Sequence, residues 1–368
     1  MNQPILPATM RAAVMYDVDD IRIEERPLPT LGPGDVLVRT AASGVCSGDL
    51  MPWYVRKKAP FVFGHEPAGT VVALGAPRAG VRDRALPSLA IGDRVFAHHH
   101  APCLGCDACL AGRFVHCATW RATSLDPGGM AEYFRVPYAN LVDTLVLPQH
   151  LSFADASLVE PLGCVVKSLR RALGIASPVS LVAGAAGAPN LLGTTLYVIG
   201  AGVMGLLHVA VASALGATVY ASDFHSNRRD LARTLGASDA FEPAAAQEAL
   251  EIATAGGLAN ATICGPGASA ALEAAVSATC NDGTVLMFTP IAPNERFSFD
   301  QSTAYFRDIR LVASYSAGPR DTRDALELIS AKVVSAALLA ATEVAFPAVE
   351  DAYAMMRDAR VVKAIVTF

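Results

Sequence analysis

Residues Gly200 to Gly205 spell Gly-Ala-Gly-Val-Met-Gly, and this G-x-G-x-x-G turn constrains the fold more than any other segment. The apolar run Leu196 to Ile199 before it has the composition of a buried strand, and a helical pattern from Val203 to Leu215 follows. In such a unit the first glycine permits the tight turn, the second lets the backbone approach a ligand, and the third lets helix and strand pack closely. The segment therefore predicts a strand–turn–helix unit of a parallel sheet.

Strands and helices continue to alternate beyond this turn. The further strand-like runs are Thr218 to Ser222, Ala261 to Cys264, Thr284 to Phe288 and Ile309 to Ala313. Helical patterns separate them, and this alternation is typical of a parallel sheet covered by helices on both faces. We therefore expect a doubly wound parallel (Rossmann) nucleotide-binding domain over residues 166–315.

The first third of the chain has a different sequence pattern, in which glycine and proline interrupt short extended segments. These segments are residues 12–15, 21–23, 36–39, 70–74 and 93–97. The last fifty or so residues hold two helical patterns and a terminal strand, Val361 to Phe368, which we expect to return to the first domain. The prediction is an α/β protein with a β-rich, barrel-like catalytic domain over residues 1–165 and 316–368.

Composition excludes several classes of protein. Of the 368 residues, 52% are hydrophobic and 17% are charged, which suits a well-buried enzyme of two domains rather than a disordered chain. The formal net charge of −5, without a basic block, argues against binding to nucleic acid or to an anionic membrane. The start of the chain lacks the pattern of a signal peptide, and no stretch has the length and apolarity of a membrane span. We therefore expect a cytoplasmic protein.

An acidic residue beyond the glycine turn indicates that the turn binds a dinucleotide. Asp223 ends the next strand at about the distance where a carboxylate binds the adenosine ribose, and it would repel a 2′-phosphate. The helix N-terminus offers free N–H groups and a positive dipole end to the pyrophosphate. The carboxylate of Asp223 therefore favours NAD over NADP, although the nearby Arg228 and Arg229 weaken that preference. The alternative interpretation of the glycine segment is a plain strand–helix turn that binds no ligand. The candidate cofactor-binding residues are Gly200, Gly202, Val203, Met204, Gly205, Asp223 and Arg228.

Four of the eight cysteines form a C-x2-C-x2-C-x7-C run, namely Cys103, Cys106, Cys109 and Cys117. Four thiolates so close in sequence can close a tetrahedral Zn²⁺ site without an open position, and such a site is structural. A bacterial ferredoxin cluster motif would continue x3-C-P, which this run does not. A zinc ribbon would normally pair two C-x2-C knuckles across a longer spacer. Cysteines clustered at metal-binding spacing indicate a reducing compartment, in which disulfides are rare.

A second set of metal-binding residue types lies outside this run. Taken alone, His65 is more often a satisfied structural residue than a ligand, and Cys46 is most often a small buried hydrophobe. Their order along the chain adds information. Gly44-Val45-Cys46, Gly64-His65-Glu66-Pro67-Ala68-Gly69, Gly92-Asp93-Arg94-Val95, the cysteine run, Glu160-Pro161-Leu162 and the glycine turn follow one another. This order resembles the zinc-dependent medium-chain alcohol dehydrogenases, most of all their sorbitol (polyol) dehydrogenase branch, over nearly the whole chain.

The resemblance implies two zinc ions per chain, one catalytic and one structural. It implies that Cys46 and His65 bind the catalytic zinc, that Glu66 and Glu160 supply the carboxylates around it, and that Asp49 accepts a hydrogen bond from His65. Zinc with an open position acts as a Lewis acid on the substrate oxygen. The implied reaction interconverts a secondary alcohol of a polyol, sugar or cyclitol with its ketone by hydride transfer to or from NAD. The alternatives are an NADPH-dependent reductase of an aldehyde or less polar ketone, and a non-catalytic binding protein with the same fold.

The chain departs from the family where the proton relay is expected. Relatives carry Ser or Thr two residues after the first cysteine ligand, and a histidine is common five residues after it; here these positions are Gly48 and Met51. Ser47, Tyr54, or Glu66 through a water molecule could substitute, and we rank Glu66 first. The family also implies a homodimer or homotetramer. Residues 75–90 read as a surface loop, and Ser177 to Thr195, rich in Gly, Ala and Pro, suggests no function.

Overall fold

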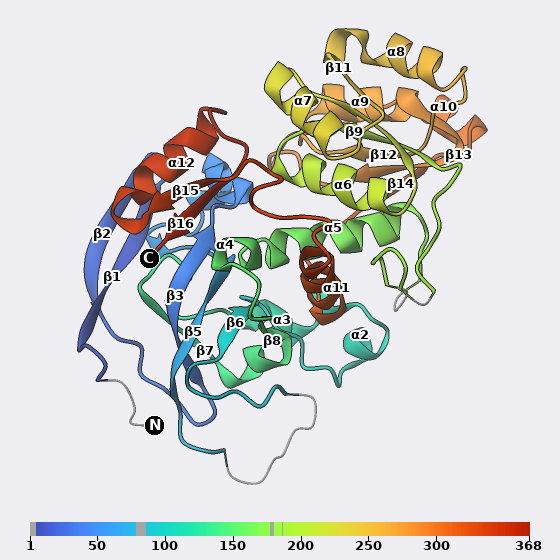
Figure 1. The fold of residues 1–368 in the computed structure, drawn as a ribbon. Helices are drawn as coiled ribbons and strands as arrows, with labels where there is room; N and C mark the ends of the chain where they lie inside the picture. Colours follow the sequence, from blue (N-terminus) through green and yellow to red (C-terminus); the bar gives the residue numbers. More distant parts are fainter. Residues whose placement is uncertain (1–4, 79–85, 177–179, 186) are drawn as a thin grey trace. The chain divides into compact units, whose positions relative to one another are not determined.

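The chain divides into two compact units, which Figure 1 shows in a computed structural model. Residues 5–78, 86–176, 180–185 and 187–368 are described. Unit 1 comprises Met1–Pro161, Ala317–Ser330 and Ser335–Phe368, and unit 2 comprises Leu162–Ser316 and Ala331–Val334. Parts of the expected loop at 75–90 and of the segment from Ser177 to Thr195 lie outside the described residues. Within the described ranges, no helix combines the length and the apolarity needed to cross a membrane.

Unit 1 is built on two sheets. A three-stranded sheet has the order β2-β1-β4, and a seven-stranded sheet has the order β15-β16-β3-β5-β6-β8, with β7 also paired to β3. The strands are β1 (Thr9–Asp17), β2 (Asp20–Pro27), β3 (Val36–Gly44), β4 (Phe61–Val62), β5 (Pro67–Leu74), β6 (Arg94–Ala97), β7 (Tyr133–Val136), β8 (Thr144–Val146), β15 (Thr342–Ala345) and β16 (Ala364–Thr367).

Helices in unit 1 are mostly single turns, because glycine and proline interrupt the chain between strands. The longer helices are amphipathic, and α12 packs against β15 and β16, where Phe346, Tyr353 and Met356 join the core under β1. The helices are η1 (Ser47–Leu50), α1 (Pro52–Val55), α2 (Asp107–Leu110), η2 (Phe114–His116), α3 (Ala118–Ala122), η3 (Tyr138–Asp143), α4 (Phe153–Ala156), α11 (Pro319–Ser330), η5 (Phe346–Ala348) and α12 (Val349–Arg357). Helix α5 (Val159–Ala172) begins in unit 1 and belongs mostly to unit 2. The boundary between the units falls within α5.

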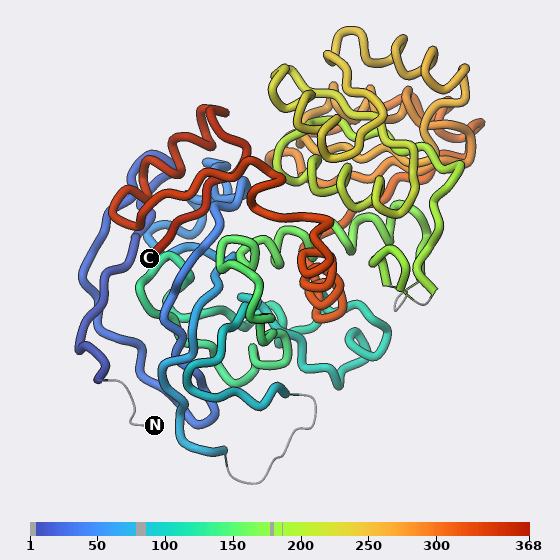
Figure 2. Tube along the Cα trace, in the orientation of Figure 1, coloured from blue at the N-terminus to red at the C-terminus, as the bar shows by residue number. Residues whose placement is uncertain are grey.

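The end of the chain completes the larger sheet of unit 1. Strand β16 pairs antiparallel with β3, in the register Ile365 to Gly44, and Figure 2 shows this terminal segment beside the early strands. Strand β3 is buried along nearly its whole length because it pairs with β16, β5 and β7. The terminal strand is therefore part of the scaffold of unit 1 rather than an appendage.

Unit 2 contains a six-stranded parallel sheet in the order β11-β10-β9-β12-β13-β14. This order reverses direction between β9 and β12, which is the topological switch point of a dinucleotide-binding fold. The strands are β9 (Thr195–Ile199), β10 (Thr218–Ser222), β11 (Asp239–Phe241), β12 (Ala259–Cys264), β13 (Thr279–Met287) and β14 (Arg310–Ala313). The helices are α6 (Val203–Ala214), α7 (Ser226–Thr234), η4 (Pro243–Ala245), α8 (Ala246–Ala253), α9 (Ser269–Ala278) and α10 (Gln301–Phe306). The predicted α/β class, with a β-rich part and a doubly wound parallel sheet, is confirmed.

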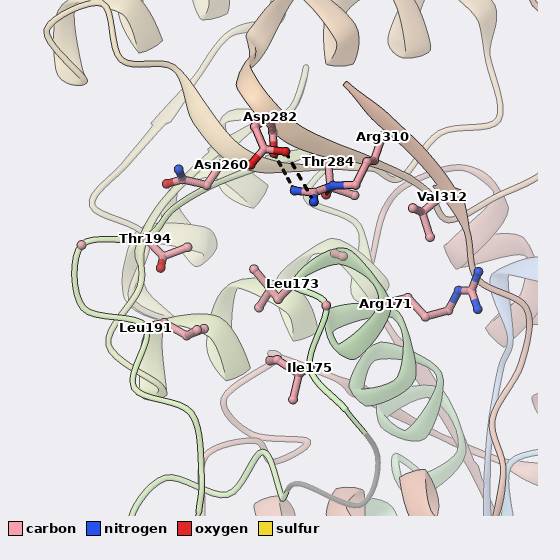
Figure 3. Close-up of a pocket in the computed structure, with 13 residues that line it drawn as sticks. Arg171, Leu173, Ile175, Leu191, Thr194, Asn260, Asp282, Thr284, Arg310 and Val312 are labelled. Carbon is pink, nitrogen blue, oxygen red and sulfur yellow. Dashed lines mark hydrogen bonds and ion pairs between the residues drawn. The ribbon is translucent and has the colours of Figure 1, made fainter. Parts of the chain in front are cut away.

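A cavity of about 420 Å³ lies in unit 2 at the amino-terminal ends of its strands. Figure 3 shows Leu173, Ile175 and Leu191 on one side of it, and Asp282 with Arg310 on the other. Ligands of open α/β sheets bind at the opposite edge, beyond the carboxyl ends of the strands. The cavity therefore does not coincide with the glycine turn, which follows the carboxyl end of β9.

Candidate active site

Three candidate catalytic residues of unit 1, Cys46, His65 and Glu66, lie where neighbouring strands of one sheet begin or end. The antiparallel register of β3 and β5 places Ser43 opposite Pro67, so the residues after β3 face the residues before β5. The same logic applies to β5 and β6, whose register places Ala68 opposite Phe96. Segments that are far apart in sequence therefore converge at one edge of the sheet.

Cys46, His65 and Glu66 meet at this edge. One ligand atom of each, the Cys46 Sγ, an imidazole nitrogen and a carboxylate oxygen, lies within 4.8 Å of the others. Cys46 caps η1, and its sulfur accepts a hydrogen bond of 3.3 Å from the Gly48 amide. A thiolate, an imidazole and a carboxylate so placed match the donor set of a catalytic zinc site with three protein ligands. The residues present therefore fit a zinc ion.

Burial and charge make this group receptive to a cation. Desolvation raises the pKa of the Cys46 thiol and of the Asp49 carboxyl above their ordinary values. Burial alone would lower the pKa of His65, but the charges of Cys46 and Asp49 outweigh it and raise that pKa well above the usual value. The negative groups around His65 therefore favour a positive charge at this position.

The expected hydrogen bond between Asp49 and His65 is not formed. Asp49 Oδ2 lies 3.6 Å from His65 Nδ1, which is too long for a hydrogen bond, although the two groups are in electrostatic contact. The imidazole is also drawn to the Cys46 sulfur, which is the larger electrostatic influence on it. Asp49 is buried beside the ligand group, so it remains a candidate for orienting His65.

Sequence reasoning missed Lys363, which lies immediately before β16. Its side chain is fully buried, its Nζ contacts Glu66 Oε2, and it donates a 2.9 Å hydrogen bond to the Val45 carbonyl. The register of β16 against β3 brings it there. A lysine inside an otherwise apolar terminal strand pattern was the available signal, because a lysine is almost never fully buried unless it is paired.

The remaining predicted residues fall into different surroundings. Ser47 is exposed, whereas Glu160 at the start of α5 is buried, and desolvation raises the pKa of its carboxyl. Glu160 has ligand atoms within 4.8 Å of those of His98 and His99, two residues that sequence reasoning also missed. The run His98-His99-His100 just after β6 was the signal that could have found them.

The four cysteines of the run converge on a second point in unit 1. Their sulfur atoms all lie within 4.8 Å of one another, with Cys106 and Cys109 at 3.6 Å and Cys103 and Cys109 at 4.0 Å. Four sulfurs around a zinc ion at ~2.3 Å define a tetrahedron with edges of ~3.8 Å. The observed separations therefore fit a closed structural zinc site and are too long for disulfides.

The glycine turn in unit 2 has the geometry that its three glycines require. Gly200 has φ of +87°, a region that L-residues rarely adopt. A Cβ on Gly205 would lie 1.9 Å from the Gly200 carbonyl oxygen, whereas a Cβ on Gly202 would meet nothing within 4 Å. Gly205 thus allows the helix to pack on the strand, and Gly202 leaves open space at the N-terminus of α6.

Asp223 connects the end of β10 to this turn. Its Oδ2 accepts a 2.9 Å hydrogen bond from the Ala201 amide, and its Oδ1 accepts one of 2.9 Å from the His225 amide. Arg228 Nη1 lies 3.8 Å from Asp223 Oδ2, so a positive charge stands beside the carboxylate. The ends of β9 and β10 therefore bring together the glycines, a carboxylate and an arginine.

Comparisons with known proteins show the family to which this chain is similar. Residues 32–148 match the alcohol dehydrogenase GroES-like domain family, and residues 203–331 match the zinc-binding dehydrogenase family. D-xylulose reductase A of Aspergillus niger is 28% identical over 369 residues, covering 96% of this chain and 95% of the relative.

Solved structures share the fold. A zinc-binding dehydrogenase from Sinorhizobium meliloti 1021 bound to NADP is 24% identical, with a TM-score of 0.81 over 98% of this chain and 100% of that chain. The 2R,3R-butanediol dehydrogenase from Bacillus subtilis is 22% identical, with a TM-score of 0.78 over 98% of this chain and 99% of that chain. The chain belongs to the zinc-dependent medium-chain alcohol dehydrogenases, as its motif order indicated. It is accordingly an oxidoreductase that uses zinc and a nicotinamide cofactor.

Proposed function

We propose that the protein interconverts a secondary alcohol of a polyol, sugar or cyclitol with its ketone, using NAD. The convergence of Cys46, His65 and Glu66 at one buried sheet edge carries the proposal, because it is the open ligand set that this chemistry needs. The similarity to D-xylulose reductase A supports a polyol as the substrate class. When bound, zinc acts as a Lewis acid on the substrate oxygen while the nicotinamide exchanges hydride with the substrate carbon.

The chain's own residues hold this ligand set in place. Lys363 fixes one carboxylate oxygen of Glu66, which leaves Oε1 for the metal or for a water molecule. Asp49 biases His65 electrostatically, and the burial of Glu66 and Asp49 keeps bulk water away from them. We assign Glu160 as a further carboxylate of the catalytic site.

The proton route avoids the positions that relatives use. Gly48 and Met51 have no group that can carry a proton, and Ser47 faces solvent. Of the remaining groups, we rank Glu66 Oε1, acting through a water molecule, ahead of Tyr54 as the carrier of the proton. Ser47→Ala should leave the pH profile of alcohol oxidation unchanged, and a shifted profile would instead place Ser47 in the relay.

The arrangement of unit 2 supports NAD as the preferred cofactor. We infer that Asp223 accepts hydrogen bonds from the ribose hydroxyls and repels a 2′-phosphate. Arg228 beside it partly offsets that repulsion. Steady-state kinetics with both cofactors test this assignment: a higher kcat/KM with NAD⁺ is expected, and Asp223→Ala should narrow the difference. Equal efficiency with NADP⁺ in the unmodified protein would overturn the preference.

We further propose two zinc ions per chain, with Cys103, Cys106, Cys109 and Cys117 holding the structural one. Unit 1 is then the catalytic domain, expected at 1–165 and 316–368, and unit 2 the nucleotide-binding domain, expected at 166–315. We also propose a cytoplasmic homodimer or homotetramer. A screen of polyols, aminocyclitols and simple alcohols for NADH formation tests the activity, and light scattering tests the assembly. Activity confined to simple primary alcohols would contradict the polyol assignment.

A further inference from the structure

Two histidines of unit 1 that have no part in the chemistry described above lie with Glu160 in a cluster of metal-ligating side chains. It consists of His98, His99 and Glu160, which offer two imidazoles and one carboxylate within 4.8 Å of one another. Two histidines with one carboxylate form a recurring ligand set for divalent metal ions. The cluster adjoins the Cys46 group, because the rings of His65 and His99 have centroids 4.9 Å apart.

The surroundings of His98 are those of a metal ligand. Its Nδ1 lies 2.7 Å from Asp143 Oδ2, and the other oxygen of Asp143 accepts a hydrogen bond from the Thr322 hydroxyl. A histidine that binds a metal usually donates its other ring N–H to a carboxylate, which fixes the tautomer and orients the ring. Asp143 and Thr322 thus direct the lone pair of His98 Nε2 toward the cluster.

Two nitrogen atoms of the cluster are buried without a partner. Among the described residues, neither His98 Nε2 nor His99 Nδ1 has a hydrogen-bond partner, and His98 is fully buried. Buried polar atoms are normally satisfied, because leaving one unpaired costs about 1–3 kcal/mol. These unpaired nitrogens point to a ligand that accepts their lone pairs.

We propose that His98, His99 and Glu160 bind a second divalent cation beside the Cys46–His65–Glu66 group. This goes beyond the proposed function, which needs a single metal ion at the Cys46–His65–Glu66 group. The set lacks a thiolate, so it accepts Mn²⁺, Fe²⁺ or Co²⁺ as well as Zn²⁺, whereas the cysteine-containing groups favour zinc. Glu160, which we also assign to the catalytic site, is the carboxylate that the two positions share.

The test uses the full-length protein loaded with about two equivalents of Zn²⁺ and titrated with Mn²⁺. The EPR signal of free Mn²⁺ should fall until about one ion per chain is bound. His98→Gln and His99→Phe should abolish this binding while zinc content and the circular dichroism spectrum stay unchanged. His100→Gln is the matched control, because the His100 Nδ1 contacts the Thr123 carbonyl and the residue lies outside the cluster.

The outcomes separate this site from the proposed catalytic site. No bound Mn²⁺ in the unmodified protein overturns the inference, and so does binding that survives in both His98→Gln and His99→Phe, which would mean an adventitious ion only. Because His99 is less buried than His98, His99→Phe remains informative should His98→Gln fail to fold. Cys46→Ser should lose one zinc and keep the Mn²⁺ site. A Cys46→Ser variant that retains all its zinc would refute the catalytic assignment without touching the Mn²⁺ result.

Discussion

The buried contact between Lys363 and Glu66 makes a sharp stability prediction. Both side chains are almost completely buried, so neither charge is solvated in the folded protein. Replacing Lys363 by Met would remove the positive charge and the hydrogen bond to the Val45 carbonyl, and would leave the Glu66 carboxylate uncompensated. Breaking one partner of a buried ion pair costs about 3–5 kcal/mol. We therefore expect Lys363→Met to destabilise metal-free unit 1 by about that amount.

The pairing itself, rather than the bulk of the lysine, is what this prediction concerns. The double variant Lys363→Met with Glu66→Gln buries neither charge, so it should recover much of the loss. Zinc should also restore stability to Lys363→Met, because a dication next to Glu66 replaces the missing charge. Arg22→Met is the matched control, since Arg22 forms an exposed ion pair with Asp20 and its loss should cost less than about 1 kcal/mol.

Urea unfolding followed by circular dichroism measures the effect. The two units can unfold in separate transitions. The loss of stability in Lys363→Met should appear in the transition of unit 1, which Cys103→Ser also affects. The reasoning is refuted if metal-free Lys363→Met is no less stable than Arg22→Met, or if the double variant is as unstable as the single one.

Three further predictions concern other parts of the chain. Cys103→Ser should lower stability and lose one zinc, whereas Cys46→Ser should lose activity and keep the fold. Metal analysis and activity assays measure both effects, and reversed phenotypes would exchange the two metal assignments. Gly202→Ala should fold normally but weaken NADH binding, whereas Gly205→Ala should destabilise unit 2, because its Cβ would lie 1.9 Å from the Gly200 carbonyl oxygen. Calorimetry measures NADH binding and thermal unfolding measures stability; equal effects of the two variants would contradict the turn geometry. Burial lowers the pKa of His208 to about 4, so the unfolded chain takes up a proton first as the pH falls. About 3 kcal/mol of stability should be lost between about pH 6.5 and pH 4, and His208→Leu should flatten this dependence in acid unfolding; an unchanged dependence would refute it.

Local sequence patterns were sufficient to predict part of this protein. The turn at Gly200 to Gly205 and the cysteine run from Cys103 to Cys117 each fall within a few residues, so spacing alone implies their geometry. The parallel sheet of unit 2 was predictable for a similar reason, because each buried strand is a short apolar run between helical patterns. In these segments the chemistry depends on neighbours in sequence.

The electrostatic partners at the sheet edge were not predictable in this way. Lys363 and Glu66 are 297 positions apart, and Asp143 reaches His98 across 45 positions. Their contacts depend on the register of β16 on β3 and of β8 on β6, where Thr144 lies opposite Ala97. A register is set by packing along whole strands, which a motif search does not see.

Strand register also explains why the ligands come from so many segments. In an antiparallel ladder, the residue that follows one strand faces the residue that precedes its neighbour, so each strand end contributes one or two side chains to the same edge. Gly44 permits the close approach, because a Cβ there would lie 2.0 Å from Glu66 Oε2. The missing side chain of Gly44 and the buried charge of Lys363 thus act on the same carboxylate, one by giving it room and the other by neutralising it. A site built from strand ends is fixed in position by the whole sheet, which is the rigidity that positioning a substrate requires.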